Sequence, residues 1–175
     1  MIKKNLLFTG APGCGKSTLI ERIIEKLDRP ACGFFTREIR EGNRRVGFSI
    51  TTLDGESGIL AREGSGGRCR VGKYGVCIDD IEKIVVPSMF PEHEGAIVVV
   101  DEIGKMECMS ELFRNTLIET LDSDHPVIGS VALRGNPFIE GIKRRSDVLV
   151  VTVTEENREQ LLGFYRDLNK RRQEL

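Results

Sequence analysis

Residues 10–18 read Gly10-Ala11-Pro12-Gly13-Cys14-Gly15-Lys16-Ser17-Thr18, a glycine-rich run that ends in a lysine and two hydroxyl side chains. The run fits the spacing Gly, four residues, Gly-Lys-Ser/Thr that is typical of a phosphate-binding P-loop. Glycine suits such a loop because the backbone must adopt positive φ angles and approach a ligand closely. Consecutive N–H groups then form a concave nest for an anion, and the N-terminus of the following helix adds positive potential.

The segments on both sides of this run supply the context that the motif requires. Residues 5–9 form a short apolar stretch that predicts a buried strand. After the run, apolar residues recur at helical spacing, at Leu19, Ile20, Ile23, Ile24 and Leu27. A strand, a loop and a helix in this order argue against a chance match. We therefore predict that residues 10–18 bind the phosphates of a nucleotide.

Three side chains inside the loop have distinct expected properties. Lys16 is expected to reach the β- and γ-phosphates, and Ser17 is expected to place its hydroxyl on Mg²⁺, the predicted cofactor. The Cys14 thiol could react with oxidants, although a loop that binds phosphate through backbone N–H groups does not need it.

The overall charge sets limits on the partners of the protein. The chain has 175 residues, a length that suits one domain over residues 1–175. Its net charge of −1 gives no overall positive field that would attract nucleic acid or a membrane. A local basic patch is compatible with this charge, so nucleic acid stays a possible partner that the charge does not support. No apolar run approaches the roughly 20 residues of a transmembrane helix, and residues 1–9 are too short for a secretion signal.

The five cysteines favour a reducing compartment. Their number is odd, none belongs to a C-x-x-C pair, and one lies inside the glycine-rich run. A disulfide framework or a zinc site is therefore not expected. We predict a cytoplasmic monomer without membrane association.

A second strong element lies at residues 96–100, a continuous apolar and mostly β-branched run. Such a run suits a central parallel strand that is buried on both faces. Further strands are predicted at 126–131 and 148–153. A helix before the first of these strands is marked by Leu112, Phe113, Leu117 and Leu121. Thr154 is expected to cap a final helix, which is buried through Leu161, Leu162, Tyr165 and Leu168. This alternation implies a parallel sheet with right-handed crossovers.

The segment 32–77 is richer in hairpin signals. Strands predicted at 32–39 and around 46–50, with a turn at 41–44, indicate an antiparallel hairpin. A third short strand follows at 59–61, and 64–68 reads as a mobile basic loop. A helix is predicted to begin at Asp79 with Glu82 as its capping-box partner, and Pro87 is expected to kink or end it. The predicted fold class is an α/β P-loop NTPase with a mostly parallel central sheet, flanking helices and an antiparallel hairpin addition.

Asp101 and Glu102 directly follow the apolar run 96–100. This is a Walker B arrangement, in which a buried strand presents carboxylates at the sheet edge where α/β proteins bind ligands. Asp101 is expected to hold Mg²⁺, directly or through water, beside Ser17. Glu102 is expected to orient or deprotonate an attacking water, the alternative being an ordinary surface carboxylate.

Four further side chains have open assignments. Lys105 could supply positive charge to the γ-phosphate, or it could be an exposed lysine at the start of a helix. Arg37 and Glu38 would face the nucleotide if their strand runs parallel to the first strand, and Arg134 follows a later strand in a similar way. For Arg37, Glu38 and Arg134, a structural or surface role is favoured.

The run 10–18, together with Val100-Asp101-Glu102-Ile103-Gly104-Lys105-Met106-Glu107, resembles the THEP1 family of nucleoside-triphosphatases. Further matching stretches at 33–38, 45–48, 70–74 and 154–158 extend the resemblance over nearly the whole chain. It implies Mg²⁺-dependent hydrolysis of nucleoside triphosphates to diphosphate and phosphate, with broad base tolerance and slow turnover.

The predicted site groups residues by role. The nucleotide-binding set is Gly10, Ala11, Pro12, Gly13, Cys14, Gly15, Lys16, Ser17, Thr18, Asp101, Glu102, Ile103 and Gly104. The catalytic set is Lys16, Glu102 and Lys105, and the metal ligands are Ser17 and Asp101.

Three functions are compatible with this set. In a hydrolase, Lys16 and Mg²⁺ would stabilise charge on the phosphates while Glu102 positions water. In a kinase for a nucleotide or nucleic acid, Glu102 would activate an acceptor hydroxyl and an arginine-rich lid would exclude water. The segment 64–73 is the lid-like candidate, or it is a surface loop. In a nucleotide-dependent switch, hydrolysis would be a timer and the hairpin addition would contact a partner.

Overall fold

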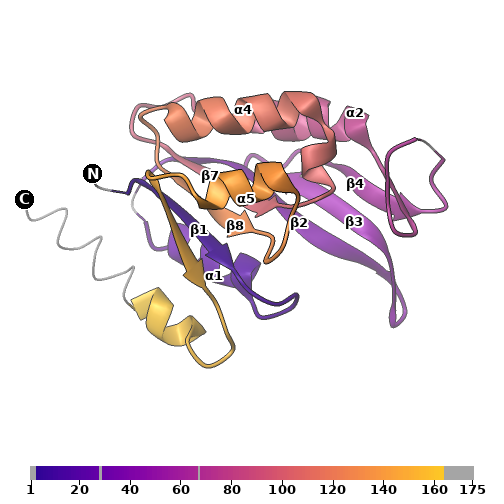
Figure 1. The fold of residues 1–175 in the computed structure, drawn as a ribbon, viewed down its shortest axis with the longest axis horizontal. Helices are drawn as coiled ribbons and strands as arrows, with labels where there is room; N and C mark the ends of the chain where they lie inside the picture. The colour runs from indigo at the N-terminus through magenta and orange to yellow at the C-terminus, as the bar shows by residue number, and fades with distance from the viewer. Residues whose placement is uncertain (1–2, 28, 67, 164–175) are drawn as a thin grey trace, which may run out of the picture.

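The computed structural model describes residues 3–27, 29–66 and 68–163, and these form one mixed sheet with helices on both faces (Figure 1). The strand order is β5-β6-β4-β3-β2-β7-β8-β1-β9. Neighbours are parallel among β2 (Ala31–Glu41), β7 (Ile97–Ile103), β8 (Val127–Val131), β1 (Asn5–Thr9) and β9 (Val148–Thr152). The sheet continues antiparallel through β3 (Arg44–Thr52), β4 (Ser57–Glu63), β6 (Tyr74–Val76) and β5 (Arg70–Val71). The predicted fold class is confirmed.

Helices cover both faces of the parallel strands, so two apolar clusters form. One face carries α4 (Glu111–Asp122), α5 (Pro137–Lys143) and a continuous helical run of α2 (Ile78–Asp80), a π-helical turn (Ile81–Val85) and α3 (Val86–Ser88). The other face carries α1 (Lys16–Ile24) and the helix at 158–163. On β7, Val98 and Val100 point into the first cluster, whereas Ile97 and Val99 point into the second. The continuous apolar run is therefore buried on both faces, as its composition predicts.

The antiparallel addition begins with the predicted hairpin. A two-residue turn, Gly42-Asn43, joins β2 to β3, and Gly42 has φ 59°, a conformation that glycine adopts without strain. The paired strands β5 and β6 were not predicted, because each is too short for an alternating pattern. β5 lies within the segment 64–73 named as a lid candidate, and β6 directly follows that segment. Within it, Lys73 pairs with Glu63 of β4 at 3.5 Å.

One sequence-based prediction about a helix is wrong. Glu82 does not close a capping box: the helix begins at Ile78, and the Glu82 carboxylate accepts a hydrogen bond from Ser110 Oγ at 2.9 Å instead. Ser110 is the N-cap of α4, so this contact ties two helices together. The helix marked by Leu112, Phe113, Leu117 and Leu121 is present as α4, with Leu112 46 % exposed.

The helix α5 was missed altogether. It is one turn shorter than most helices, and Gly141 lies inside it. Asn136 caps it by accepting a hydrogen bond from Ile139 N at 3.0 Å, and Pro137 occupies the first helical position.

The chain after β9 begins as predicted. The Thr154 hydroxyl accepts a hydrogen bond from Asn157 N at 3.3 Å, and the Asn157 side chain accepts one from Thr154 N at 2.8 Å. This reciprocal cap precedes the helix at 158–163. The predictions for Tyr165 and Leu168 lie outside the described residues. Within residues 3–27, 29–66 and 68–163, no helix has the length and apolar character needed to cross a membrane.

Candidate active site

A cavity of about 700 Å³ lies where the parallel strands end, between the P-loop and the antiparallel addition. The loop after β1 forms one wall, and the ends of β7 and β8 form the floor. The end of β2 and side chains from β3, β4 and β5 form the opposite wall. Ligands of open α/β sheets bind at this edge.

The P-loop glycines are required by close contacts as well as by backbone angles. Gly10 has φ 151°, and a Cβ there would lie 2.5 Å from the Val153 carbonyl oxygen. Gly15 has φ 92°, and a Cβ there would lie 2.5 Å from Arg158 Nη1. Arg158 therefore covers the loop just before α1. A side chain at either glycine would displace the end of β9 or the residues after it.

Lys16 spans the loop from the first turn of α1. Its Nζ donates hydrogen bonds to the carbonyl oxygens of Gly10 at 3.2 Å and Ala11 at 3.0 Å, and it lies 3.9 Å from Cys14 Sγ. The ammonium group is thus held beside the backbone nest, as expected for a group that meets the phosphates.

Asp101 has the environment of a metal ligand. It is 1 % exposed, and its Oδ2 accepts hydrogen bonds from Thr36 N at 2.9 Å and Thr36 Oγ1 at 3.1 Å. Within the described part of the chain, its buried Oδ1 has no partner. A buried carboxylate oxygen without a partner is costly unless a cation or a donor meets it.

The donor set fits Mg²⁺. This ion is usually bound by one or two carboxylates together with substrate phosphates and water, rather than by a cage of protein ligands. Accordingly, the described residues contain no group of three or more His, Cys, Asp or Glu that could hold a metal. Asp101 and the Ser17 hydroxyl, which lines the same cavity, would hold the ion.

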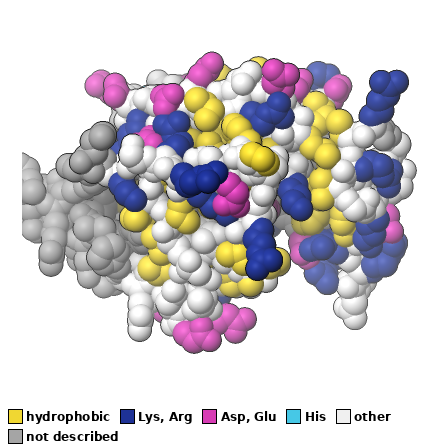
Figure 2. Space-filling view, viewed as in Figure 1, with side chains coloured by type: hydrophobic (Ala, Val, Ile, Leu, Met, Phe, Trp, Pro, Cys, Tyr) yellow, Lys and Arg dark blue, Asp and Glu magenta, His cyan; other side chains and the backbone are white. Residues whose placement is uncertain are grey.

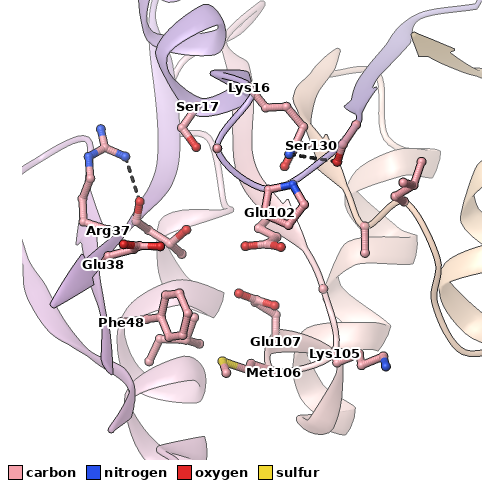
Figure 3. A pocket seen from close by; sticks show the side chains of 18 of the residues that line it. Lys16, Ser17, Arg37, Glu38, Phe48, Glu102, Lys105, Met106, Glu107 and Ser130 are labelled. Carbon is pink, nitrogen blue, oxygen red and sulfur yellow. Dashed lines mark hydrogen bonds between the residues drawn. The ribbon is translucent and has the colours of Figure 1, made fainter. Parts of the chain in front are cut away.

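Sequence reasoning missed Thr36 and Ser130. Thr36 orients the Asp101 carboxylate, as described above, from the neighbouring strand β2. Ser130 is 2 % exposed and donates a hydrogen bond from its hydroxyl to the Asp101 carbonyl oxygen. It lines the cavity from β8, the strand between β1 and β7 (Figure 3). Neither contact has a sequence signal, because each joins strands that are far apart in the chain.

Glu102 faces a second carboxyl group, that of Glu107 (Figure 3). A Cβ at Gly104 would lie 2.8 Å from Glu107 Oε2 and 3.3 Å from Glu102 Oε1, so the glycine leaves room for both groups. Burial and then the Asp101 charge raise the pKa of Glu102, while Lys16 and Arg45 oppose the shift. Burial and then the Glu102 charge raise the pKa of Glu107 well above its ordinary value. The surroundings therefore disfavour the ionised form of Glu107 more strongly than that of Glu102.

The structure also places the four residues with open assignments. Arg37 and Glu38 line the cavity because β2 does run parallel to β7, and Arg37 Nη1 lies 3.8 Å from Asp101 Oδ2. Arg134 lies at the exposed rim. Lys105 is exposed, and its ammonium group points away from Glu102 (Figure 3). This geometry favours the interpretation of Lys105 as an exposed lysine.

Comparison with known proteins identifies the family of the chain. A family model described as NTPase matches residues 5–163. The nucleoside-triphosphatase THEP1 of Thermotoga maritima is 46% identical over 161 residues, which cover 90% of this chain and 91% of the relative. The chain belongs to the THEP1 family of nucleoside-triphosphatases. The human cancer-related nucleoside-triphosphatase is 40% identical over 178 residues, covering 91% of this chain and 93% of the relative.

Solved structures of THEP1 relatives share the fold. The crystal structure of THEP1 from Aquifex aeolicus is similar with a TM-score of 0.83 at 31% identity, covering 91% of this chain and 95% of that chain. The solution structure of the human cancer-related nucleoside triphosphatase gives a TM-score of 0.78 at 37% identity, covering 92% of this chain and 94% of that chain.

Proposed function

We propose that this protein hydrolyses nucleoside 5′-triphosphates to the diphosphate and phosphate, with Mg²⁺ as its cofactor. One observation carries the proposal: the P-loop, the buried Asp101 with its unpartnered Oδ1, and Glu102 line or border one cavity. The names of the THEP1 relatives, which are nucleoside-triphosphatases, support it.

In this proposal the residues of the site bind the phosphates, neutralise their charge and accept one proton. Residues 10–18 hold the phosphates through backbone N–H groups, and the Lys16 ammonium meets charge on the β- and γ-oxygens. When bound to Ser17 and Asp101, Mg²⁺ supplies further neutralisation of that charge. Glu102 accepts a proton from water as the water oxygen bonds to the γ-phosphorus and the bond to the bridging oxygen breaks. The diphosphate leaves with that electron pair.

A second function, phosphoryl transfer to an acceptor hydroxyl, is favoured by one specific feature. Beyond Glu102 the cavity continues along the apolar side chains of Phe48, Leu60, Val71 and Met106. Apolar walls are not needed to hold a water, whereas they would shield an acceptor from solvent. In this function Glu102 would take the proton of the acceptor hydroxyl.

The test is phosphate release from the purified protein with ATP, GTP, CTP or UTP, with and without Mg²⁺. We expect one phosphate for each diphosphate formed, without an added acceptor and only when Mg²⁺ is present. Negligible phosphate release without an acceptor, together with turnover on addition of a nucleoside, nucleotide or polynucleotide, would show that the protein is a kinase rather than a hydrolase. A cytoplasmic, monomeric enzyme remains part of the proposal, based on the cysteine pattern and charge.

A further inference from the structure

Arg45 enters the active-site cavity from the wall opposite the P-loop. It belongs to β3, in the antiparallel addition, and is therefore supplied by a different part of the sheet from Lys16. Lys105, the cation that sequence reasoning assigned to the γ-phosphate, points away from Glu102. Arg45 is thus the cation that the addition contributes to a cavity also lined by Lys16, Arg37, Lys105 and Arg134.

The Arg45 guanidinium is held in place by three side chains. Its Nε donates to Tyr74 Oη at 3.2 Å, and its Nη1 donates to Glu38 Oε1 at 2.8 Å. The guanidinium carbon lies 5.0 Å from the centre of the Phe48 ring and 5.8 Å from that of Tyr74. The two rings pack edge to face with centroids 5.4 Å apart. A charge held in this way needs little reorganisation when a ligand arrives.

These contacts do not neutralise the charge of Arg45. A guanidinium has five N–H donors, and among the described residues Arg45 donates one from Nε and one from Nη1. Its acidic partner Glu38 is shared with Arg40, so the three side chains carry a net positive charge. Arg45 and Glu102 line the same cavity.

We propose that Arg45 is a catalytic residue that donates hydrogen bonds to the γ-phosphoryl oxygens in the transition state, from the side opposite Lys16. In phosphoryl transfer, charge spreads over three equatorial oxygens, and cations on two sides stabilise it better than one. This inference rests on the proposed hydrolysis at the same site. It assigns to the antiparallel addition a direct part in catalysis.

The test compares Arg45→Gln with Arg44→Gln in the full chain. Arg44 is the adjacent residue, is 60 % exposed at its side chain, and pairs with Glu63 and Glu41 outside the cavity. We expect Arg45→Gln to lower kcat by on the order of 10²–10³-fold, as for loss of one preorganised donor, with little change in KM or ADP affinity. Arg44→Gln should keep the wild-type rate. Added guanidinium ion should partly restore Arg45→Gln but not Lys16→Ala.

A second readout separates catalysis from a structural role. The complex of ADP, Mg²⁺ and aluminium fluoride mimics the transferred phosphoryl group, and Arg45→Gln should bind it more weakly while binding ADP normally. A lower melting temperature of Arg45→Gln would show that this variant unfolds more easily than the wild type. In that case kcat and the affinity for the fluoride complex are measured on Arg45→Lys, which keeps a cation at this position. Wild-type kcat and wild-type affinity for the fluoride complex in a folded Arg45 variant would overturn the inference. An inactive wild-type protein would instead overturn the proposed function.

Discussion

Asp101 and Glu102 are neighbours in the chain, yet alternation along β7 gives their side chains different surroundings. Asp101 is clamped by Thr36 and keeps one oxygen without a partner, whereas Glu102 lines the cavity opposite Glu107. The first environment suits a metal ligand and the second suits a base. The single-residue predictions below follow from this difference.

Asp101→Asn should weaken Mg²⁺ binding, because an amide oxygen carries no charge for the ion. Thr36 can still donate to that oxygen, so the fold should be kept. We expect activity to be lost at about 1 mM Mg²⁺ and partly regained at roughly tenfold higher concentration. A titration of the phosphate-release rate with Mg²⁺ checks this. A defect that no Mg²⁺ concentration relieves would remove Asp101 from the metal site.

Glu107→Gln should stabilise the metal-free protein more at neutral than at acid pH. The pKa of Glu107 is raised in the folded state by burial and by Glu102. As the pH rises above the ordinary glutamate pKa, the unfolded chain releases this proton while the folded protein retains it, so wild-type stability falls. Glutamine has no such proton.

The measurement is urea unfolding in EDTA between about pH 4 and pH 7. The free energy of unfolding of Glu107→Gln minus that of the wild type should increase with pH. Glu94→Gln, at an exposed loop position, is the matched control and should show no such trend. A difference that is constant or falls with pH would contradict the assignment of the retained proton to Glu107.

At the scale of elements, Ser110 joins three helical segments, one of which carries the cavity-lining Glu107. It follows the 3₁₀ turn at Glu107–Met109, caps α4 by accepting from Phe113 N at 3.0 Å, and donates to Glu82. Ser110→Ala should therefore lower the free energy of unfolding by about 1–2 kcal/mol. Denaturant unfolding checks this, with exposed Ser146→Ala as control. Equal stabilities for the two variants would show that the cap contributes nothing.

Local patterns made the elements around the P-loop predictable. The strand Asn5–Thr9, the loop, the start of α1 and the buried strand β7 each have a signal within about ten residues. The short elements α5, β5 and β6 have no such signal, since packing against the sheet stabilises them rather than periodicity.

The candidate site was predictable where its residues belong to one motif. Lys16, Ser17, Asp101 and Glu102 are placed around one cavity by two contiguous motifs. Arg45, Thr36 and Ser130 reach it through strand order, which no local pattern specifies. Lys105 follows Glu102 closely in sequence and lines the same cavity, but its ammonium group points away from Glu102 (Figure 3).

For the whole molecule, charge is arranged locally rather than globally. Lys and Arg side chains gather over the end that carries β3 and β4, with Asp and Glu among them (Figure 2). Several of these cations pair with acids, in Arg40–Glu38, Arg44–Glu63, Arg62–Glu41 and Lys73–Glu63. This pairing reduces the field that a polyanion would meet at this end of the molecule.

The protein should discriminate weakly between bases. The residues assigned to the ligand, 10–18, Asp101 and Glu102, are expected to meet its phosphates and the metal rather than its base. We expect kcat/KM values for ATP and GTP within about tenfold, or roughly 1.4 kcal/mol. Competition among the four triphosphates checks this. A preference above about a thousandfold would require a site with buried polar groups that reads the base.

Phosphate release and nucleotide binding, measured together for the wild type and Glu102→Gln with Mg²⁺ and ATP, test the central claim most directly. The wild type should release phosphate in step with ADP. Glu102→Gln should bind the nucleotide with a Kd within about threefold of the wild type, because its contacts to the phosphates remain. Its turnover should fall by on the order of 10²–10⁴-fold, the usual contribution of a general base. Turnover of Glu102→Gln at the wild-type rate would contradict the account.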